Sequence, residues 1–407
     1  MKKDRTKVLI ISQYFPPDVS GGGTRAHNFA QCLAAEDFDV TVITAFPHLH
    51  EAVSDKYKKK IMIKEKMDNF SIIRVWIPSI LHSSIKNRIF LHLCFIISSL
   101  FPLFTNKPDI IFASEPNLFS IIPAFLYSKI RGGKIIRVVD DLWPELFYER
   151  NIVKSKILKS ILNKLAKFSY DYPKYVIPLT EEAKSHISNL YKIDLKKIVV
   201  IQHGVNEKIF TAIKKEVQEK FVLMYSGALV ESYDFDLILN AAEKLQNENI
   251  EFIIRGKGPL LDYIRKKKLD LKLNNLTIDE KIIPYKDISA MLSNADAFVV
   301  PMKDDYFLNL SLPTKILEFQ AMSRPIICCS NGAPGNHVKK TNSGITIPCN
   351  SLPDFILAIK KLQKDFELCK EFGKNGEEFV KENVRFKKIG EMLKQIIKTV
   401  QNNNNST

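Results

Sequence analysis

The chain has 407 residues, of which 45% are hydrophobic, and a formal net charge of +15 at pH 7. This length exceeds what one hydrophobic core usually supports, so we expect two domains. The charge favours anionic partners such as nucleic acid, anionic lipid or phosphorylated substrates. A lysine-rich but otherwise ordinary globular protein explains the same charge, because the basic residues are spread along the chain.

The cysteines and the chain start predict a cytoplasmic protein. No CxxC pair and no metal-ligand spacing occurs among the cysteines, so we expect reduced thiols and no metal site. The amino terminus enters a strand without a signal-peptide-like apolar region. The longest apolar run, Ile89–Phe104, contains His92 and Pro102 and is short for a transmembrane helix. It predicts either a core helix or a helix lying in a membrane interface.

Apolar strands alternate with helical segments through the first half of the chain. After the first strand, a polar glycine-containing loop leads into a helix from about Thr24 to Ala35. The strands are expected at Lys7–Ser12, Val40–Ala45, Ser71–Ile77, Asp109–Ser114, Ile135–Val139 and Tyr175–Leu179. This alternation predicts an α/β domain with a doubly wound parallel sheet.

The same alternation restarts in the second half, which predicts a second Rossmann-like domain. Its strands are expected at Phe221–Ser226, Glu251–Arg255, Leu276–Ile278, Ala297–Pro301, Ile326–Ser330 and Gly344–Ile347. A turn at Gln202–Asn206 predicts an amino-terminal domain over residues 1–203 and a carboxyl-terminal domain over 204–384. Residues 385–407 are expected to form a helix, which can cross back to the first domain, and a disordered tail.

The stretch Asn309–Gly332 carries a candidate site. Ser311 is expected to cap a helix that has Pro313 in its first turn. Ser311, Lys315 and Glu318 then fall on one face of an otherwise apolar helix, so this polar stripe is expected to face a cleft. Lys315 and the helix N–H groups suit an anion, and Glu318 suits a ribose diol. A surface Lys–Glu pair explains the same spacing.

Other candidate residues follow predicted strands, where ligands of open α/β sheets bind. Gly21, Gly22 and Gly23 join the first strand to the first helix and can bring N–H groups close to a ligand. Asp140 and Asp141 end another strand, with Asp141 the preferred site residue and helix capping the alternative. In the second half, glycines or basic residues end two strands, at Gly227, Arg255 and Gly256.

These segments resemble the GT-B glycosyltransferases of family 4 type, in particular a subgroup that builds bacterial surface polysaccharides. The resemblance rests on Pro313-Thr314-Lys315-Ile316-Leu317-Glu318, Tyr225-Ser226-Gly227, Arg255-Gly256-Lys257-Gly258-Pro259 and Asp141-Leu142-Trp143-Pro144. It implies two Rossmann-like domains facing across a cleft. Three departures stand out: Ser323 replaces a usual glycine, Leu310 stands where a sugar-binding glutamate is usual, and residues 229–234 lack the usual arginine and lysine.

The resemblance implies the roles of individual residues. Asp141, Lys315 and Glu318 are expected at the catalytic centre. Donor contacts are expected from Gly21, Gly22, Gly23, Gly227, Arg255, Gly256, Pro284, Tyr285, Ser311, Lys315 and Glu318. Pro284 and Tyr285 would pack along the nucleobase, and His203 would be structural. No cofactor is expected besides the nucleotide-sugar donor, and no metal.

The expected function is transfer of a sugar from a nucleotide-diphosphate sugar, with UDP preferred, to a glycan or polyprenyl-diphosphate-linked acceptor, with retention. A nucleotide-sugar epimerase or hydrolase on the same fold and a non-enzymatic basic binding protein are the alternatives. No nucleic-acid reader motif and no GxGxxG fingerprint occurs. Peripheral contact with the inner membrane leaflet is expected from Ile89–Phe104 and the lysines of Lys56–Lys66.

Overall fold

The structure is a computed structural model that describes residues 5–18, 21–47, 55–57, 59–78, 85–105, 107–114, 118–149, 152–213, 219–281 and 283–402. The chain divides into two compact units. The first unit comprises Met1–Gly204 and Phe386–Thr407, and the second comprises Val205–Arg385. The carboxyl-terminal helix therefore belongs to the first unit, where it packs against the first helix of the chain.

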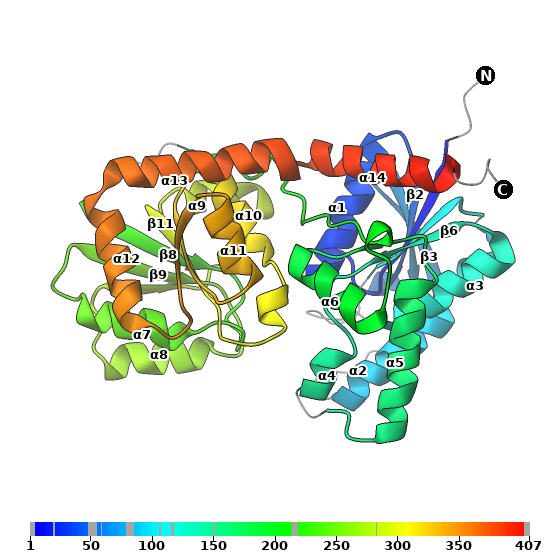
Figure 1. Cartoon of the computed structure of the whole chain (residues 1–407), viewed down its shortest axis with the longest axis horizontal. Coiled ribbons are helices and arrows are strands. Elements are labelled where there is room, and N and C mark those ends of the chain that lie inside the picture. The colour runs from blue at the N-terminus through cyan, green and yellow to red at the C-terminus, as the bar shows by residue number, and fades with distance from the viewer. Residues whose placement is uncertain are drawn as a thin grey trace. The chain divides into compact units, whose positions relative to one another are not determined.

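The first unit is built on a seven-stranded sheet with the strand order β3-β4-β2-β1-β5-β6-β7 (Figure 1). Its strands are β1 (Lys7–Ile11), β2 (Asp39–Ala45), β3 (Met62–Met67), β4 (Phe70–Val75), β5 (Ile110–Ala113), β6 (Lys134–Val138) and β7 (Tyr175–Ile177). The sheet is parallel except for β3, which pairs antiparallel with β4 at the edge. Strand β3 was not expected from the sequence, and it runs antiparallel because the hairpin turn after it is too short for a crossover.

Helices cover both faces of this sheet. Successive residues of β1 alternate between two cores, with Val8 and Ile10 in one and Leu9 and Ile11 in the other, as the period of a strand requires. Helices α1 and α14 pack on the first core, and α2, α3 and α5 on the second. The helices are α1 (Gly21–Ala35), α2 (Ile85–Ser98), α3 (Ile121–Arg131), α4 (Glu145–Glu149), α5 (Lys156–Asp171), α6 (Glu181–Tyr191) and α14 (Phe386–Asn402).

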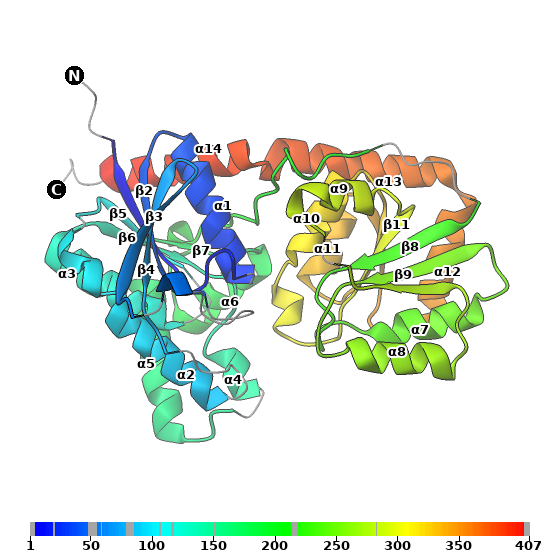
Figure 2. The same cartoon turned by 180° about the vertical axis from the view of Figure 1, so that it is seen from behind.

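The second unit is built on a six-stranded, fully parallel sheet with the order β10-β9-β8-β11-β12-β13 (Figure 2). Its strands are β8 (Phe221–Ser226), β9 (Ile250–Arg255), β10 (Leu276–Asp279), β11 (Ala297–Pro301), β12 (Ile326–Cys329) and β13 (Gly344–Ile347). The strand order reverses between β8 and β11. Ligands of open α/β sheets bind at such a reversal, beyond the carboxyl ends of the strands.

Helices also cover both faces of the second sheet. They are α7 (Phe235–Lys244), α8 (Leu261–Asp270), α9 (Ile288–Leu292), α10 (Thr314–Ala321), α11 (Ala333–Lys340), α12 (Leu352–Lys364) and α13 (Phe366–Phe379). Helix α10 is short but firmly placed, because Ile316, Leu317 and Phe319 are buried in one core. The Phe319 ring stacks on Phe298 of β11, with ring centroids 4.0 Å apart. The polar residues of α10 are thereby fixed against the sheet.

Candidate active site

Two glycines form a tight junction at the carboxyl ends of β8 and β9. Gly227 and Gly256 have φ angles of +145° and +141°, which L side chains rarely adopt. A Cβ atom added to Gly256 would lie 1.8 Å from the Gly227 carbonyl oxygen. The backbones of the two turns are therefore in direct contact, and only glycine fits at position 256.

The ammonium group of Lys315 lies beside this glycine junction. A Cβ atom added to Gly227 would lie 2.6 Å from the Lys315 Nζ atom. The ammonium donates a hydrogen bond of 2.8 Å to the Tyr225 hydroxyl, and that hydroxyl donates one of 2.6 Å to the Ala228 carbonyl. The same ammonium lies 4.1 Å from the centre of the Tyr225 ring and 3.9 Å from that of Tyr233. Two aromatic rings thus hold the cation where β8 ends.

Burial changes the acid–base behaviour of Lys315 and Glu318. Burial lowers the pKa of Lys315 to about 7, against the opposing effect of the Glu318 charge. Burial likewise raises the pKa of Glu318 to about 7, and the Lys315 charge opposes that rise. Both side chains lie on α10, so the site holds a cation and an acid that each exchange a proton near neutrality. Such perturbed groups are typical of functional sites.

The Ser311 hydroxyl does not cap α10, so that expectation is wrong. The helix begins at Thr314, with Pro313 in the N-cap position and no side-chain cap. The Ser311 hydroxyl instead donates to the Leu308 carbonyl at 3.1 Å, because residues 308–310 form a short 3-10 turn that ends there. Lys315 and Glu318 consequently lie in the first turns of the helix.

The guanidinium of Arg255 is held by protein groups. Its Nη1 atom is paired with the Asp279 carboxylate, and its Nη2 atom donates to the Lys281 carbonyl at 2.6 Å. The structure does not bring Arg255 into a contact with Lys315. Pro284 is exposed on the segment after β10, and the side chain of Tyr285 lies outside the described residues. Lys315 is therefore the cation that the structure places at the glycine junction.

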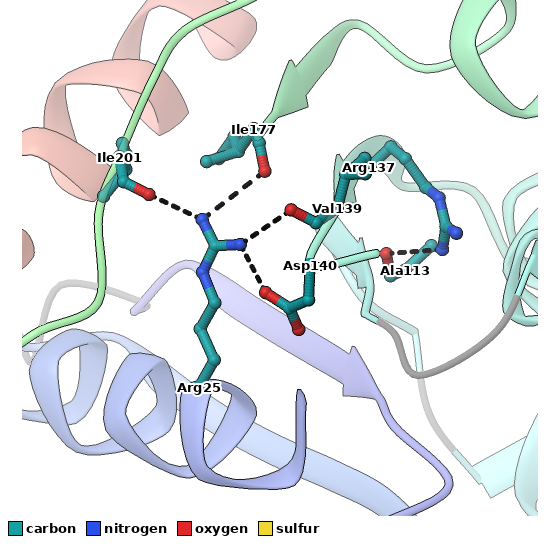
Figure 3. Close-up of polar contacts among 7 residues, drawn as sticks. All are labelled: Arg25, Ala113, Arg137, Val139, Asp140, Ile177 and Ile201. Carbon is teal, nitrogen blue, oxygen red and sulfur yellow. Dashed lines mark hydrogen bonds and ion pairs between the residues drawn. The ribbon is translucent and has the colours of Figure 1, made fainter. Parts of the chain in front are cut away.

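Arg25 on α1 is the centre of a buried polar cluster in the first unit, and sequence reasoning missed it (Figure 3). Its guanidinium donates to the Val139 carbonyl at 3.0 Å, to Ile201 at 2.6 Å and to Ile177 at 3.4 Å. It also forms a 2.6 Å ion pair with the Asp140 carboxylate. One arginine thereby joins the ends of β6 and β7 to the segment that leads to the second unit.

Asp140 and Asp141 have different surroundings. Asp140 faces Arg25 and is almost fully buried, whereas Asp141 is exposed. His203 lies near the same cluster, and burial, followed by the charge of Arg25, lowers its pKa to about 4. A histidine that stays neutral in the core fits a structural role. Of the two aspartates, Asp141 is the more exposed.

Gly21, Gly22 and Gly23 form the first turn of α1. The expected helix start at Thr24 is therefore three residues late. The N–H groups of a first helical turn have no partners within the helix. The three glycines therefore lie at the start of the helix and not in a preceding loop.

Comparison with known proteins shows which class of protein has this fold. The family described as "Glycosyltransferase Family 4" matches residues 19–208, and "Glycosyl transferases group 1" matches residues 206–379. The structure is similar to the sucrose-phosphate synthase of Thermosynechococcus elongatus, with a TM-score of 0.78 and 15% identity over 97% of this chain and 99% of that one. The protein is thus a glycosyltransferase with the GT-B fold.

Two curated relatives narrow the class. The chain is 22% identical to the putative colanic acid biosynthesis glycosyl transferase WcaI of Escherichia coli K12, over 78% of this chain and 81% of WcaI. It is 29% identical to an Escherichia coli UDP-Gal:alpha-D-GlcNAc-diphosphoundecaprenol alpha-1,3-galactosyltransferase, over 52% and 57% of the two chains. The chain belongs to the glycosyltransferases of group 1 and family 4 type, and it is related to enzymes of bacterial polysaccharide biosynthesis.

Proposed function

We propose that this glycosyltransferase takes its sugar from a UDP-sugar and transfers it, with retention of configuration, to a glycan or polyprenyl-diphosphate-linked acceptor. The observation that carries the donor assignment is the Lys315 ammonium beside the turns of Gly227 and Gly256. The relative that uses UDP-galactose and a diphosphoundecaprenol acceptor supports the choice of both substrates.

In the proposed mechanism, Lys315 neutralises the charge that develops on the departing diphosphate. The N–H groups of the first turn of α10 assist, because they point toward the start of the helix. Glu318 accepts hydrogen bonds from donor hydroxyl groups. Asp141 takes the proton of the acceptor hydroxyl. The reaction needs no cofactor and no bound metal, so transfer that is unchanged by EDTA is expected.

Calorimetric titration with UDP-sugars tests this proposal. Lys315→Ala and Glu318→Ala are each expected to weaken binding by tenfold or more, on the order of the loss of one buried charged contact. Lys360→Ala is the matched control. Lys360 is an exposed lysine of the same unit that pairs with Glu248 at 2.8 Å, and its removal is expected to leave binding unchanged.

Two results would contradict the proposal. If Lys315→Ala and Glu318→Ala both bind UDP-sugar as the native protein does, the donor site is elsewhere. If the donor is consumed at the same rate without any acceptor, the enzyme is a hydrolase or epimerase. Mass spectrometry of products from a panel of nucleotide sugars and lipid-linked acceptors identifies the true pair. We further propose that the enzyme acts in the cytoplasm at the inner leaflet of the membrane.

A further inference from the structure

An exposed apolar stripe runs along α2 and the 3-10 helix Phe101–Thr105 that follows it. Its members recur every three or four residues and are Phe90, Leu93, Ile97, Phe101 and Phe104. Ile97 is 64% exposed and Phe104 is 75% exposed. The opposite side of these helices packs against the core through Leu91, Phe95 and Leu103. The segment Asn87–Thr105 is long and apolar enough to cross a membrane by length and composition, yet only 39% of it is buried.

Helix α5 exposes a second apolar group. Ile157, Leu158 and Ile161 are exposed near its start, and Ile157 reaches 76%. Exposed lysines flank them on the same helix or just before it, at Lys154, Lys156, Lys164 and Lys167. The helix is securely folded, because Leu162 and Ala166 are buried and the Ser155 hydroxyl caps its start. The isoleucines are therefore exposed in the folded unit, and their exposure does not come from an unfolded helix.

The two helices belong to one part of the first unit. Leu91 and Phe95 of α2 and Leu165 and Phe168 of α5 pack against the same core. Both helices also contact the short turn Leu118–Ser120. Figures 1 and 2 show α2 and α5 at the same end of the first unit. We call the exposed side chains of α2, of residues 101–105 and of α5 the two-helix surface.

The charge of the two-helix surface is strongly one-sided. Residues 85–108 contain Lys86, Arg88 and Lys107 and no acidic residue. Residues 152–170 contain five lysines and no acidic residue, and the one acid of α5 is its last residue, Asp171. One other exposed leucine beside lysines has an acid next to it. On α8, Leu269 follows Lys266–Lys268, but Asp262 and Asp270 lie on the same helix. Exposed apolar groups bordered mainly by cations, with Glu149 of α4 and Asp171 of α5 as the nearby acids, are complementary to a surface with anionic headgroups over an apolar interior.

We propose that the two-helix surface docks on anionic phospholipid bilayers, with its apolar side chains inserted at the interface and its lysines on the phosphates. A second copy of this chain is a poor occupant, because it would oppose lysines with lysines. The docking itself does not depend on the proposed function. Only its purpose, which is to bring the enzyme to a lipid-linked acceptor, rests on that function.

Flotation of the full-length protein with phosphatidylcholine vesicles, with and without phosphatidylglycerol, tests the inference. Binding is expected only to the anionic vesicles at about 0.1 M salt. Ile97→Ser with Phe104→Ser, and separately Ile157→Ser with Ile161→Ser, are each expected to weaken binding about tenfold. Lys164→Gln with Lys167→Gln is expected to weaken it about tenfold at low salt and much less at high salt. Leu269→Ser is the control and is expected to bind as the native protein does.

UDP affinity, measured by calorimetry on the same variants, separates this inference from the proposed function. All of these substitutions are at exposed positions, so UDP affinity is expected to stay unchanged. The inference is overturned if the native protein does not float with anionic vesicles at low salt, or if both apolar double variants float as well as it does. It is also overturned if the protein forms dimers that Ile157→Ser with Ile161→Ser disrupts while no vesicle binding occurs. If the native protein does not bind UDP, the assignment of a UDP-sugar as the donor is contradicted instead.

Discussion

The Lys315 ammonium on α10 donates a 2.8 Å hydrogen bond to the Tyr225 hydroxyl on β8. The two residues are 90 positions apart in sequence, and this bond fixes the cation against the end of the strand. Tyr233 supplies a second ring under the same ammonium. The family that the chain resembles usually has an arginine and a lysine in residues 229–234, whereas this chain has the aromatic Tyr233 there. The cation of the site comes from a different element and is held by the tyrosines.

Tyr225→Phe is expected to impair the site through Lys315. The change removes the acceptor of the ammonium hydrogen bond and the donor to the Ala228 carbonyl. Leaving buried polar groups unpaired costs about 1–3 kcal/mol. The charged form of Lys315 loses a partner, so its pKa falls further, and UDP affinity at pH 8 should drop severalfold. Isothermal calorimetry on the purified variant measures this loss.

Tyr127→Phe is the matched control for this prediction. Tyr127 is a fully buried tyrosine of the first unit whose hydroxyl donates to the Ser99 carbonyl at 3.2 Å. Its change should lower the melting temperature while UDP affinity stays the same. Equal UDP affinities in both variants and the native protein would show that Tyr225 does not position Lys315.

The pH dependence of UDP binding should report the titration of Lys315. Its pKa of about 7 in the free protein lies below its ordinary value of 10.5. Above pH 7 the free amine must therefore take up a proton before it can pair with the diphosphate. Affinity should fall by up to about tenfold per pH unit between pH 7.5 and 9, a range above the phosphate pKa of about 6. Calorimetry in buffers of different ionisation enthalpy would detect the proton uptake directly.

Lys315→Met provides the comparison for the pH experiment. This variant should bind UDP weakly, and its binding should lack the proton uptake that Lys315 contributes. The native protein without ligand should also gain stability between pH 7 and 10.5, because the unfolded chain then binds the proton that folded Lys315 has released. A native affinity that is flat above pH 7.5 would mean that Lys315 is fully charged in the free protein.

Gly227→Ala should mainly impair UDP binding, whereas Gly256→Ala should mainly lower stability. At position 256 the new methyl group would meet the Gly227 backbone, so a loss of about 3 kcal/mol or more in unfolding free energy is expected. At position 227 it would meet the ammonium end of the Lys315 side chain and displace it, so UDP affinity should suffer more than stability. Gly132→Ala is the control for a positive φ without crowding and should cost about 1 kcal/mol.

Urea unfolding and calorimetric titration of the three glycine variants would give both quantities. The expected order of destabilisation is Gly256→Ala above Gly227→Ala above Gly132→Ala. A Gly227→Ala protein that binds UDP normally would show that the Lys315 ammonium does not occupy the position described here in solution.

The fold class could be predicted because buried parallel strands leave a strong signal. Each is a continuous apolar run such as Phe221–Ser226, and the structure confirms a strand there and two sheets with helices on both faces. Strand β3 left no such signal, because Met62–Met67 carries three charges. It is an edge strand, and its Glu65 is accommodated by an ion pair with Arg74 on β4. A charge that is neutralised by another strand cannot be recognised from the local pattern.

The site was less predictable, because its contacts join residues distant in sequence. Lys315 and Glu318 stood out by helical spacing alone. The sequence could not show that Tyr225 and Tyr233 hold Lys315, or that Asp279 holds Arg255. Arg25 could have been suspected, since it follows three glycines at the start of an apolar helix. Its partners Val139 and Ile201 lie 114 and 176 residues away, and only the folded structure identifies them.

Asp140 and Asp141 should respond to substitution in opposite ways. Asp140→Ala leaves the Arg25 guanidinium buried without its carboxylate, which is expected to cost about 3–5 kcal/mol of stability. Asp141 is exposed, so Asp141→Asn should change stability by less than about 0.5 kcal/mol. If Asp141 takes the acceptor proton, the same change should lower the transfer rate by about 100-fold or more while donor affinity is unchanged. Melting curves, calorimetry and transfer assays on both variants distinguish the roles. A stable Asp140→Ala protein without activity, together with a fully active Asp141→Asn protein, would reverse the assignment and make Asp140 the catalytic group.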